Sequence, residues 1–220
     1  MLLSNVQFSR QIVYDMHMTQ IWTVESLKDF ELDIVEIFNS GAIKAPVHLS
    51  DGNESDLIEI FKEIRKQDWV FCSWRSHYQC LLKGVPPEEV RQEIIAGRSI
   101  SLGFPEYNVF SSAIVGGNIP ISIGVAKAEK LKNSGNKVWC FIGDMTSETG
   151  IAQTCIRYAE THDLPITFVV EDNGLSVLTN TRSVWASSTL RFNERQSSKV
   201  RFFEYKSKYP HAGAGVRVQF

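Results

Sequence analysis

The stretch that decides the fold runs from Val138 to Ser176. Residues 138–150 read V-W-C-F-I-G-D-M-T-S-E-T-G, and residues 166–176 read I-T-F-V-V-E-D-N-G-L-S. Each segment opens with a short apolar run, which predicts a buried strand, and continues into an acidic turn. The apolar residues between the two strands recur at helical spacing: Ile151, Ala152, Cys155, Ile156 and Ala159. The stretch therefore predicts a strand, a helix and a second strand, with parallel strands and a right-handed crossover.

The two acidic turns are expected at the same edge of the sheet. Parallel strands end together, and open α/β sheets bind ligands at this carboxyl edge. This geometry brings Asp144 close to Asn173, and a carboxylate with an amide oxygen suits Mg²⁺ or Ca²⁺. The turn into the helix offers free N–H groups to a phosphate. We therefore predict a metal-bridged phosphate or diphosphate site, with a helix cap at Asp144 and a turn closed by Asn173 as the structural alternative.

Length and composition are typical of a soluble globular protein. The 220 residues predict a single α/β domain over residues 1–220. Apolar residues make up 43% and charged residues 22%, and the net charge of −2 gives no indication of nucleic-acid binding. No apolar run is long enough for a membrane span, and the first ten residues lack signal-peptide features. The four cysteines form no C-x-x-C pair, so we expect reduced core cysteines in a cytoplasmic protein.

The same patterns predict the elements on either side of the central stretch. Helices are expected within residues 4–40 and 57–64, from Pro86 onward, and in the small-residue run 113–128, where close packing across a subunit interface is possible. Strands are expected at 69–72 and 200–205. Loops are expected at 43–50 and 97–112, and a loop with one short helix after residue 176.

A second candidate for anion binding follows the strand at 69–72. Residues 73–84 read S-W-R-S-H-Y-Q-C-L-L-K-G, with Arg75 and His77 at the start of a helix. An arginine makes forked contacts to phosphate, and a histidine donates a hydrogen bond or moves a proton. The structural alternative is a surface arginine and a helix-capping histidine.

These motifs, in this order, resemble a known family. The G-D-x turn followed by an asparagine turn resembles the thiamine diphosphate motif, and the chain is similar to the α subunit of the E1 component of 2-oxo acid dehydrogenases. The resemblance implies a thiamine diphosphate-binding α/β fold, a mostly parallel sheet with helices on both faces. It also implies that Mg²⁺ is held by Asp144, Asn173 and the main-chain carbonyl of Leu175. Two residues depart from the family pattern: Met145 replaces a glycine and Asp172 replaces an asparagine.

The resemblance also assigns cofactor contacts, residue by residue. The S-W-R-S-H block matches an aromatic-Arg-x-His core, so Trp74 and Arg75 are expected on the diphosphate. The turn residues Met145 and Thr146 are expected beside them. The run A-I-V-G-G-N-I-P matches a family segment that lines the cofactor, which places Ala113 and Val115 there.

Three histidines match active-site positions of the family. His48 falls in A-P-V-H-L-S-D-G-N-E, which resembles the family's H-x-x-x-G-x-E segment. His77 belongs to the block described above, and His211 is the nearest match to a histidine in a loop that closes over the cofactor. We therefore expect them to transfer protons or to bind the substrate or an intermediate, and proton transfer requires pKa values near neutral.

The function implied is cleavage or formation of a carbon–carbon bond next to a carbonyl, most simply decarboxylation of a 2-oxo acid. The resemblance implies that a β subunit supplies the glutamate that activates the cofactor, in an α₂β₂ assembly. Two alternatives stay open: a transketolase-like transferase split into two chains, because E-D-N-G-L also resembles transketolases, and a non-catalytic subunit, suggested by Met145 and the short chain.

Overall fold

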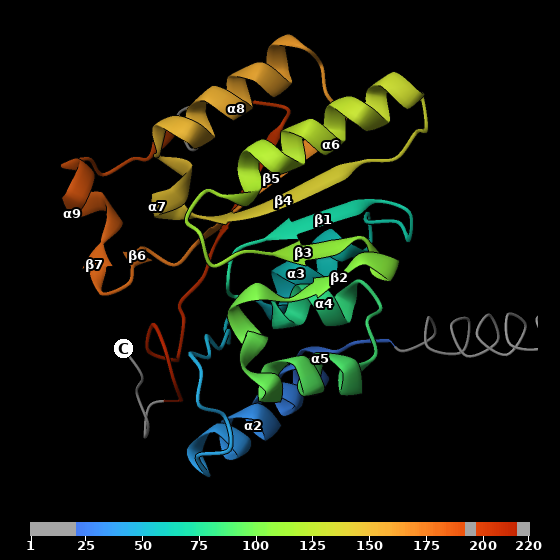
Figure 1. Ribbon diagram of the computed structural model, residues 1–220. Helices are drawn as coiled ribbons and strands as arrows, with labels where there is room; N and C mark the ends of the chain where they lie inside the picture. The colour runs from blue at the N-terminus through green and yellow to red at the C-terminus, as the bar shows by residue number, and fades with distance from the viewer. Residues whose placement is uncertain (1–20, 192–196, 215–220) are drawn as a thin grey trace, which may run out of the picture.

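The computed structural model describes residues 21–191 and 197–214. Within this part of the chain, six strands form one sheet in the order β2-β3-β1-β4-β5-β8 (Figure 1). All neighbouring strands are parallel except β2 and β3. The strands are β1 (Trp69–Cys72), β2 (Gly103–Phe104), β3 (Val109–Ser111), β4 (Val138–Gly143), β5 (Ile166–Asp172) and β8 (Val200–Glu204). The mixed α/β fold with a mostly parallel sheet is therefore confirmed.

Helices cover both faces of the sheet (Figure 1). On one face lie α2 (Val24–Asn39), α3 (Glu54–Phe61), α4 (His77–Leu82) and α5 (Pro87–Glu93), and on the other lie α6 (Asn118–Lys132) and α8 (Gly150–Thr161). Strand β4 shows why both faces need cover. Trp139 and Phe141 pack into the core under α2 to α5, whereas Val138, Cys140 and Ile142 pack under α6 and α8. Successive side chains of a strand point to opposite faces, so a strand covered on both sides is apolar throughout.

The predicted strand–helix–strand unit is present. β4 and β5 pair in parallel from Val138↔Ile166 to Gly143↔Glu171. Helix α8 begins after Thr149, whose hydroxyl accepts a hydrogen bond from the N–H of Ala152 at 3.4 Å. Four of its five predicted core residues are buried, but Ile151 is 44% exposed.

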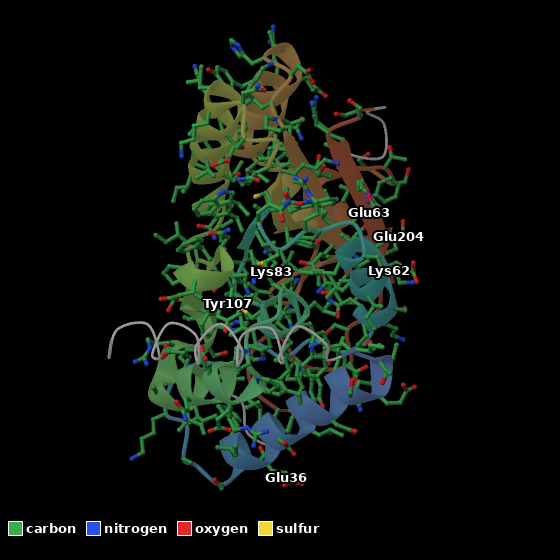
Figure 2. All side chains as sticks on the ribbon, turned by 90° about the vertical axis from the view of Figure 1, so that its right-hand side faces the viewer. Glu36, Lys62, Glu63, Lys83, Tyr107 and Glu204 are labelled. Atoms are coloured by element: carbon green, nitrogen blue, oxygen red, sulfur yellow. The ribbon has the colours of Figure 1, made fainter. Side chains whose placement is uncertain are left out.

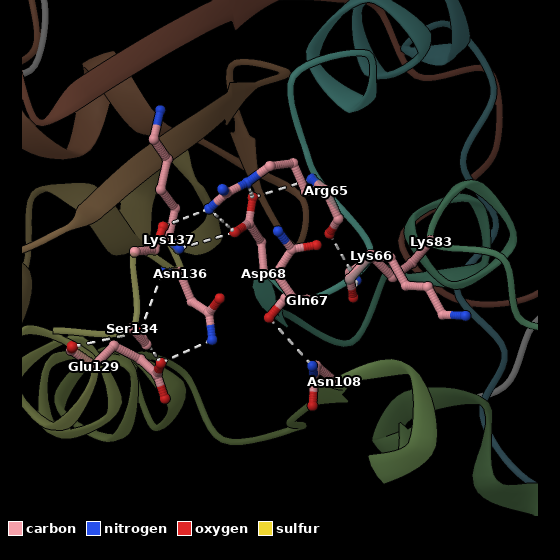
Figure 3. A network of polar contacts seen from close by, with 11 residues as sticks. Arg65, Lys66, Gln67, Asp68, Lys83, Asn108, Glu129, Ser134, Asn136 and Lys137 are labelled. Carbon is pink, nitrogen blue, oxygen red and sulfur yellow. Dashed lines mark hydrogen bonds and ion pairs between the residues drawn. The ribbon is translucent and has the colours of Figure 1, made fainter. Parts of the chain in front are cut away.

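A buried carboxylate, Asp68, joins the start of β1 to the start of β4 (Figure 3). Asp68 accepts hydrogen bonds from the Arg65 guanidinium at 2.7 Å and from the N–H of Lys137 at 2.9 Å. Burial alone would raise the pKa of Asp68, but these hydrogen bonds outweigh it and hold that pKa below its usual value. The contact fixes the residue before β1 against the residue before β4, and so supports their register.

Residues 97–112 correct a sequence-based expectation. They were expected to be a loop, but they contain β2, β3 and the 3₁₀ turns Ser99–Ser101 and Pro105–Tyr107, after a π turn at Ile94–Arg98. Both strands are too short to give the apolar run of four or more residues that signals a strand. Pairing of Val109 with Val70 of β1 holds β3 in the sheet.

The other expected elements agree with the structure within the described residues. The helix expected within 4–40 is α2, and residues 4–20 lie outside the described part. The helix in 113–128 begins only at Asn118, and all four cysteines are free and buried. Charged side chains such as Glu36, Lys62 and Glu63 lie exposed on the outer surface of α2 and after α3 (Figure 2). None of the described helices is both long and apolar enough to cross a membrane.

Candidate functional site

A cavity of about 130 Å³ lies at the carboxyl ends of the central strands. Its walls come from the turns after β1, β4 and β5, from Val115 in the loop before α6, and from the segment after β8. Nine of the twelve residues expected at the site line it: Trp74, Arg75, Val115, Asp144, Met145, Thr146, Asn173, Leu175 and His211. Segments distant in sequence therefore meet where the parallel strands end.

Asp144 lies at the floor of this cavity with one oxygen unpaired. The residue is the first of the single helical turn α7 (Asp144–Ser147), which follows Gly143 at the end of β4. Asp144 is 1% exposed, and its Oδ2 has no hydrogen-bond partner within the described residues. Burial raises the pKa of Asp144 to about 6, and the charge of Asp172 adds to this, while the Thr181 hydroxyl opposes it. A buried unpaired carboxylate oxygen favours a bound cation, so the donor fits a metal ion.

The turn after β5 carries the second and third oxygen donors. Asn173 Oδ1 accepts a hydrogen bond from the N–H of Leu175 at 3.0 Å, which is the turn-closing role that we gave as the structural alternative. A carbonyl oxygen has two lone pairs, so this bond leaves one for a second partner. The hairpin of β6 (Leu175–Ser176) and β7 (Thr179–Asn180) and the short helix α9 (Thr181–Trp185) follow directly.

Asp172 is paired rather than left as an extra negative charge. Both of its carboxylate oxygens accept hydrogen bonds from Arg182 of α9, at 3.0 Å and 2.6 Å. The sequence singles out Asp172 as a departure from the family pattern, but it gives no sign of this partner. Arg182 lies ten positions away, in a segment expected to be a loop with one short helix.

Arg75, Trp74 and His211 line another part of the cavity, and His48 lies outside the lining but contacts the Trp74 and His211 rings. The Arg75 guanidinium donates to the main-chain oxygen of Leu49. His48 Nε2 lies 3.3 Å from His211 Nε2, and Trp74 lies beside both rings, with centroids 6.0 and 6.2 Å away. Burial, followed by the charge of Arg75, lowers the pKa of His48 to about 3 and also lowers that of His211. His48 is therefore a neutral imidazole at neutral pH in this chain, short of the near-neutral pKa that proton transfer requires.

His77 and Ala113 lie outside the cavity. His77 is fully buried, with Nδ1 3.0 Å from Glu31 Oε1 and Nε2 2.8 Å from Ser99 Oγ. Both ring nitrogens are engaged in the core beneath α2, so the structure does not bring His77 to the site. Ala113 is exposed on the loop before α6 and does not line the cavity, whereas Val115 does.

Glu171 is a cavity residue that the sequence did not single out. It is 8% exposed, and its carboxyl oxygens accept hydrogen bonds from the amides of Asn53 at 3.2 Å and Gln79 at 3.1 Å. Burial raises the pKa of Glu171 to about 8, although Asn53, Arg75 and Gln79 oppose this rise. The only signal was its place at the end of a buried strand, directly before the metal-type turn.

A model of one protein family matches most of the chain. The family model described as "Dehydrogenase E1 component" matches residues 23–194. The chain belongs to the dehydrogenase E1 component family. The matched residues include the turns after β1, β4 and β5, and so most of the cavity wall.

Relatives of the chain are named as α subunits. The α subunit of an acetoin:2,6-dichlorophenolindophenol oxidoreductase from Cupriavidus necator is 28% identical over 167 residues, covering 71% of this chain and 50% of the relative. Subunit alpha-3 of a chloroplastic pyruvate dehydrogenase E1 component from Arabidopsis thaliana is 30% identical, and the match covers 66% of this chain and 38% of the relative. The α subunit of the Rickettsia typhi pyruvate dehydrogenase E1 component is 28% identical, and the match covers 81% of this chain and 57% of the relative. The chain spans about half the length of the curated relatives it matches.

Proposed function

We propose that this chain is the α subunit of a thiamine diphosphate-dependent enzyme that decarboxylates a 2-oxo acid. One observation carries the proposal: the blocks around Arg75, Asp144 and Asn173 line one cavity, although they are far apart in sequence. Membership of the E1 component family supports it.

Mg²⁺ and the diphosphate are assigned to residues whose chemistry suits them. Asp144 Oδ2, Asn173 Oδ1 and the main-chain oxygen of Leu175 are hard oxygen donors, the type that Mg²⁺ prefers, and the first is buried and unpaired. Arg75 and Trp74 are proposed to contact the diphosphate, and Met145, Thr146 and Val115 to lie along the cofactor. When bound, thiamine diphosphate supplies an electron sink for breaking the bond next to a carbonyl.

His48 and His211 are proposed to touch the substrate. His211 lines the cavity and His48 contacts His211, and the pKa values of both are lowered, so they offer neutral imidazoles. A neutral imidazole has one donor and one acceptor nitrogen, which suits orientation of a carboxylate or carbonyl group. His77 has no proposed contact with the substrate, because Glu31 and Ser99 engage both of its ring nitrogens.

A β subunit is proposed to complete the site. A cavity of about 130 Å³ is small beside pockets that bind whole cofactors, which span roughly 300–1,000 Å³. Exposed apolar side chains lie around its mouth and on the adjoining helix: Ile114, Val115, Ile121, Ile151, Val177 and Leu178. On α6, an added Cβ at Gly124 would meet nothing within 4 Å in this chain. An apolar surface of this kind fits a subunit interface. We propose an α₂β₂ assembly in which the β subunit supplies the activating glutamate, and a cytoplasmic location consistent with the free cysteines.

Turnover by the co-expressed chain and β partner tests this function. We expect CO₂ release from a 2-oxo acid with an artificial electron acceptor, abolished by Asp144→Ala and retained by Asp163→Ala, which removes an exposed aspartate paired with Lys199. Turnover of sugar phosphates instead would favour the split transketolase. Absence of turnover with either class would favour a non-catalytic subunit, for which Met145 in the cavity wall is the supporting observation.

A further inference from the structure

The turn that carries the proposed metal donors is held by an ion pair with a segment outside the sheet. Asp172 is 2% exposed, and Arg182 contacts it with both ends of its guanidinium: Nη1 to Oδ1 at 3.0 Å and Nη2 to Oδ2 at 2.6 Å. The N–H of Gly174 donates to the same Oδ1 at 2.9 Å. A forked arginine–carboxylate contact fixes orientation as well as distance.

The local chain is arranged to bring Arg182 to this position. After Gly174 the backbone forms the β6–β7 hairpin and returns, so that the N–H of Thr181 donates to the oxygen of Gly174 at 3.0 Å. Asn180 then caps α9, with its Oδ1 accepting from the N–H of Ser183 at 2.9 Å. Arg182 follows in the first turn of α9, where its guanidinium reaches the Asp172 carboxylate. The hairpin and α9 therefore bring Arg182 back to the turn that contains Asn173 and leads into Leu175.

The charge of Asp172 requires such a partner. Asp144 and Asp172 directly follow Gly143 and Glu171, which pair across β4 and β5, and Glu204 lies 3.9 Å from Arg182 on the outer side. Without Arg182, a buried carboxylate would stand unpaired beside the carboxylate proposed to hold Mg²⁺, and close to the negative diphosphate. An unpaired buried charge is costly, and like charges repel strongly where water is excluded.

We propose that Arg182 is a positioning residue of the cofactor site: it holds the 171–175 turn so that Asn173 and the Leu175 carbonyl face the metal, and it cancels the charge that Asp172 adds. Its ligand, the diphosphate with Mg²⁺, rests on the proposed function. Arg182 acts through Asp172 and itself touches neither the metal nor the cofactor.

A double-mutant comparison separates this role from simple packing of α9. The variants are Arg182→Gln, Asp172→Asn and the pair together, with Arg182→Lys as a charge-keeping variant where Arg182→Gln does not fold. Arg201→Gln is the matched control, because it removes an arginine paired with Glu63 at an exposed position. If Arg182 only packed α9, changing Asp172 would not restore wild-type behaviour to the Arg182→Gln variant. If Arg182 balances the charge of Asp172, removing that charge would restore it.

The first measurement needs no cofactor. Hydrogen exchange of residues 171–176 in the metal-free chain is expected to speed up in Arg182→Gln, to return toward the wild-type rate in the double variant, and to stay unchanged in Arg201→Gln. Unchanged exchange in Arg182→Gln would overturn the positioning role.

The second measurement is thiamine diphosphate affinity of the complex with its β partner at saturating Mg²⁺. Arg182→Gln is expected to weaken binding about tenfold, as for loss of one partner of a buried charged hydrogen bond. The double variant is expected to recover most of this loss. A double variant as weak as Arg182→Gln would overturn the proposal. If the wild-type complex binds no thiamine diphosphate, the proposed function fails, and the exchange measurement alone decides the role of Arg182.

Discussion

His48 Nε2 lies 3.3 Å from His211 Nε2, although 163 positions separate the two residues. One histidine precedes α3 and the other follows β8. The N–H of Gly213 donates to the oxygen of Val47 at 2.8 Å, so the main chain also holds the two segments together. This contact places His48 beside His211, which lines the cavity, and burial lowers the pKa of both imidazoles.

Replacing these histidines should impair turnover more than cofactor binding. We expect His48→Ala and His211→Ala each to lower kcat of the assembled enzyme by about 100-fold, because each change removes an imidazole proposed to orient the substrate. Neither histidine is proposed to hold the diphosphate, so the affinity for thiamine diphosphate should change little. His162→Ala, an exposed histidine packed on Tyr158, is the control. Equal loss in cofactor affinity and in kcat would contradict this assignment.

The buried Asp144 should destabilise the metal-free chain at neutral pH. Its pKa is raised to about 6 from the usual value of 3.8, so its ionisation lowers the free energy of unfolding as the pH rises from about 4 through 6. Asp144→Asn should therefore be more stable than wild type by about 3 kcal/mol at pH 8 without metal, from about 1.4 kcal/mol per pKa unit. Near pH 4 this advantage should disappear. Urea unfolding at both pH values measures it, and an Asp144→Asn variant less stable than wild type at pH 8 would contradict it.

Asp68 should show the opposite pH dependence. Its pKa is held below the usual value, so its ionised form stabilises the fold above the unfolded-state pKa. This contribution is lost as the pH falls through the lowered folded-state pKa. We expect Asp68→Asn to lower the free energy of unfolding at pH 7 by about 1–3 kcal/mol, because the donors of Arg65 and Lys137 lose a charged acceptor. The difference between variant and wild type should shrink in acid, and a difference that is constant with pH would refute this.

Gly52 should tolerate no side chain. Its φ is +109°, and an added Cβ would lie 2.4 Å from the main-chain oxygen of Lys206. Gly135 is a matched control, because its φ is also positive, at +76°, but an added Cβ there meets nothing within 4 Å. Gly135→Ala should cost about 1 kcal/mol from backbone strain alone. Gly52→Ala should cost clearly more, and equal melting temperatures for the two variants would show that the contact with Lys206 is unimportant.

Gly124 tests the subunit interface. In the isolated chain, Gly124→Ala should raise stability by about 1 kcal/mol, because glycine is unfavourable in a helix interior. Gly124→Leu should leave the isolated chain folded but prevent assembly with the β partner, as seen by size-exclusion chromatography with light scattering. Normal assembly of Gly124→Leu would place the interface elsewhere.

The centre of the fold could be predicted because its signals are local. The apolar runs at 138–142 and 166–170 define β4 and β5, and parallel pairing then places Asp144 and Asn173 at one edge. The strands within 97–112 could not be predicted, because β2 and β3 are held by pairing with each other and with β1 rather than by their own pattern.

The parts of the site that were missed depend on long-range contacts. His77 looked accessible at a helix start, but Glu31 and Ser99, distant in sequence, enclose it. Glu171 looked like one acidic residue in a turn, but it is buried and accepts hydrogen bonds from the amides of Asn53 and Gln79. The partner of Asp172 emerges only when α9 folds back.

The most direct test of the account is calorimetric titration of thiamine diphosphate into the complex of this chain with its β partner, with and without Mg²⁺. We expect binding that requires Mg²⁺, is lost in Asp144→Ala and persists in Asp163→Ala. Absence of binding by the wild-type complex, or equal binding by Asp144→Ala, would contradict the claim that Asp144 and Asn173 form a metal–diphosphate site.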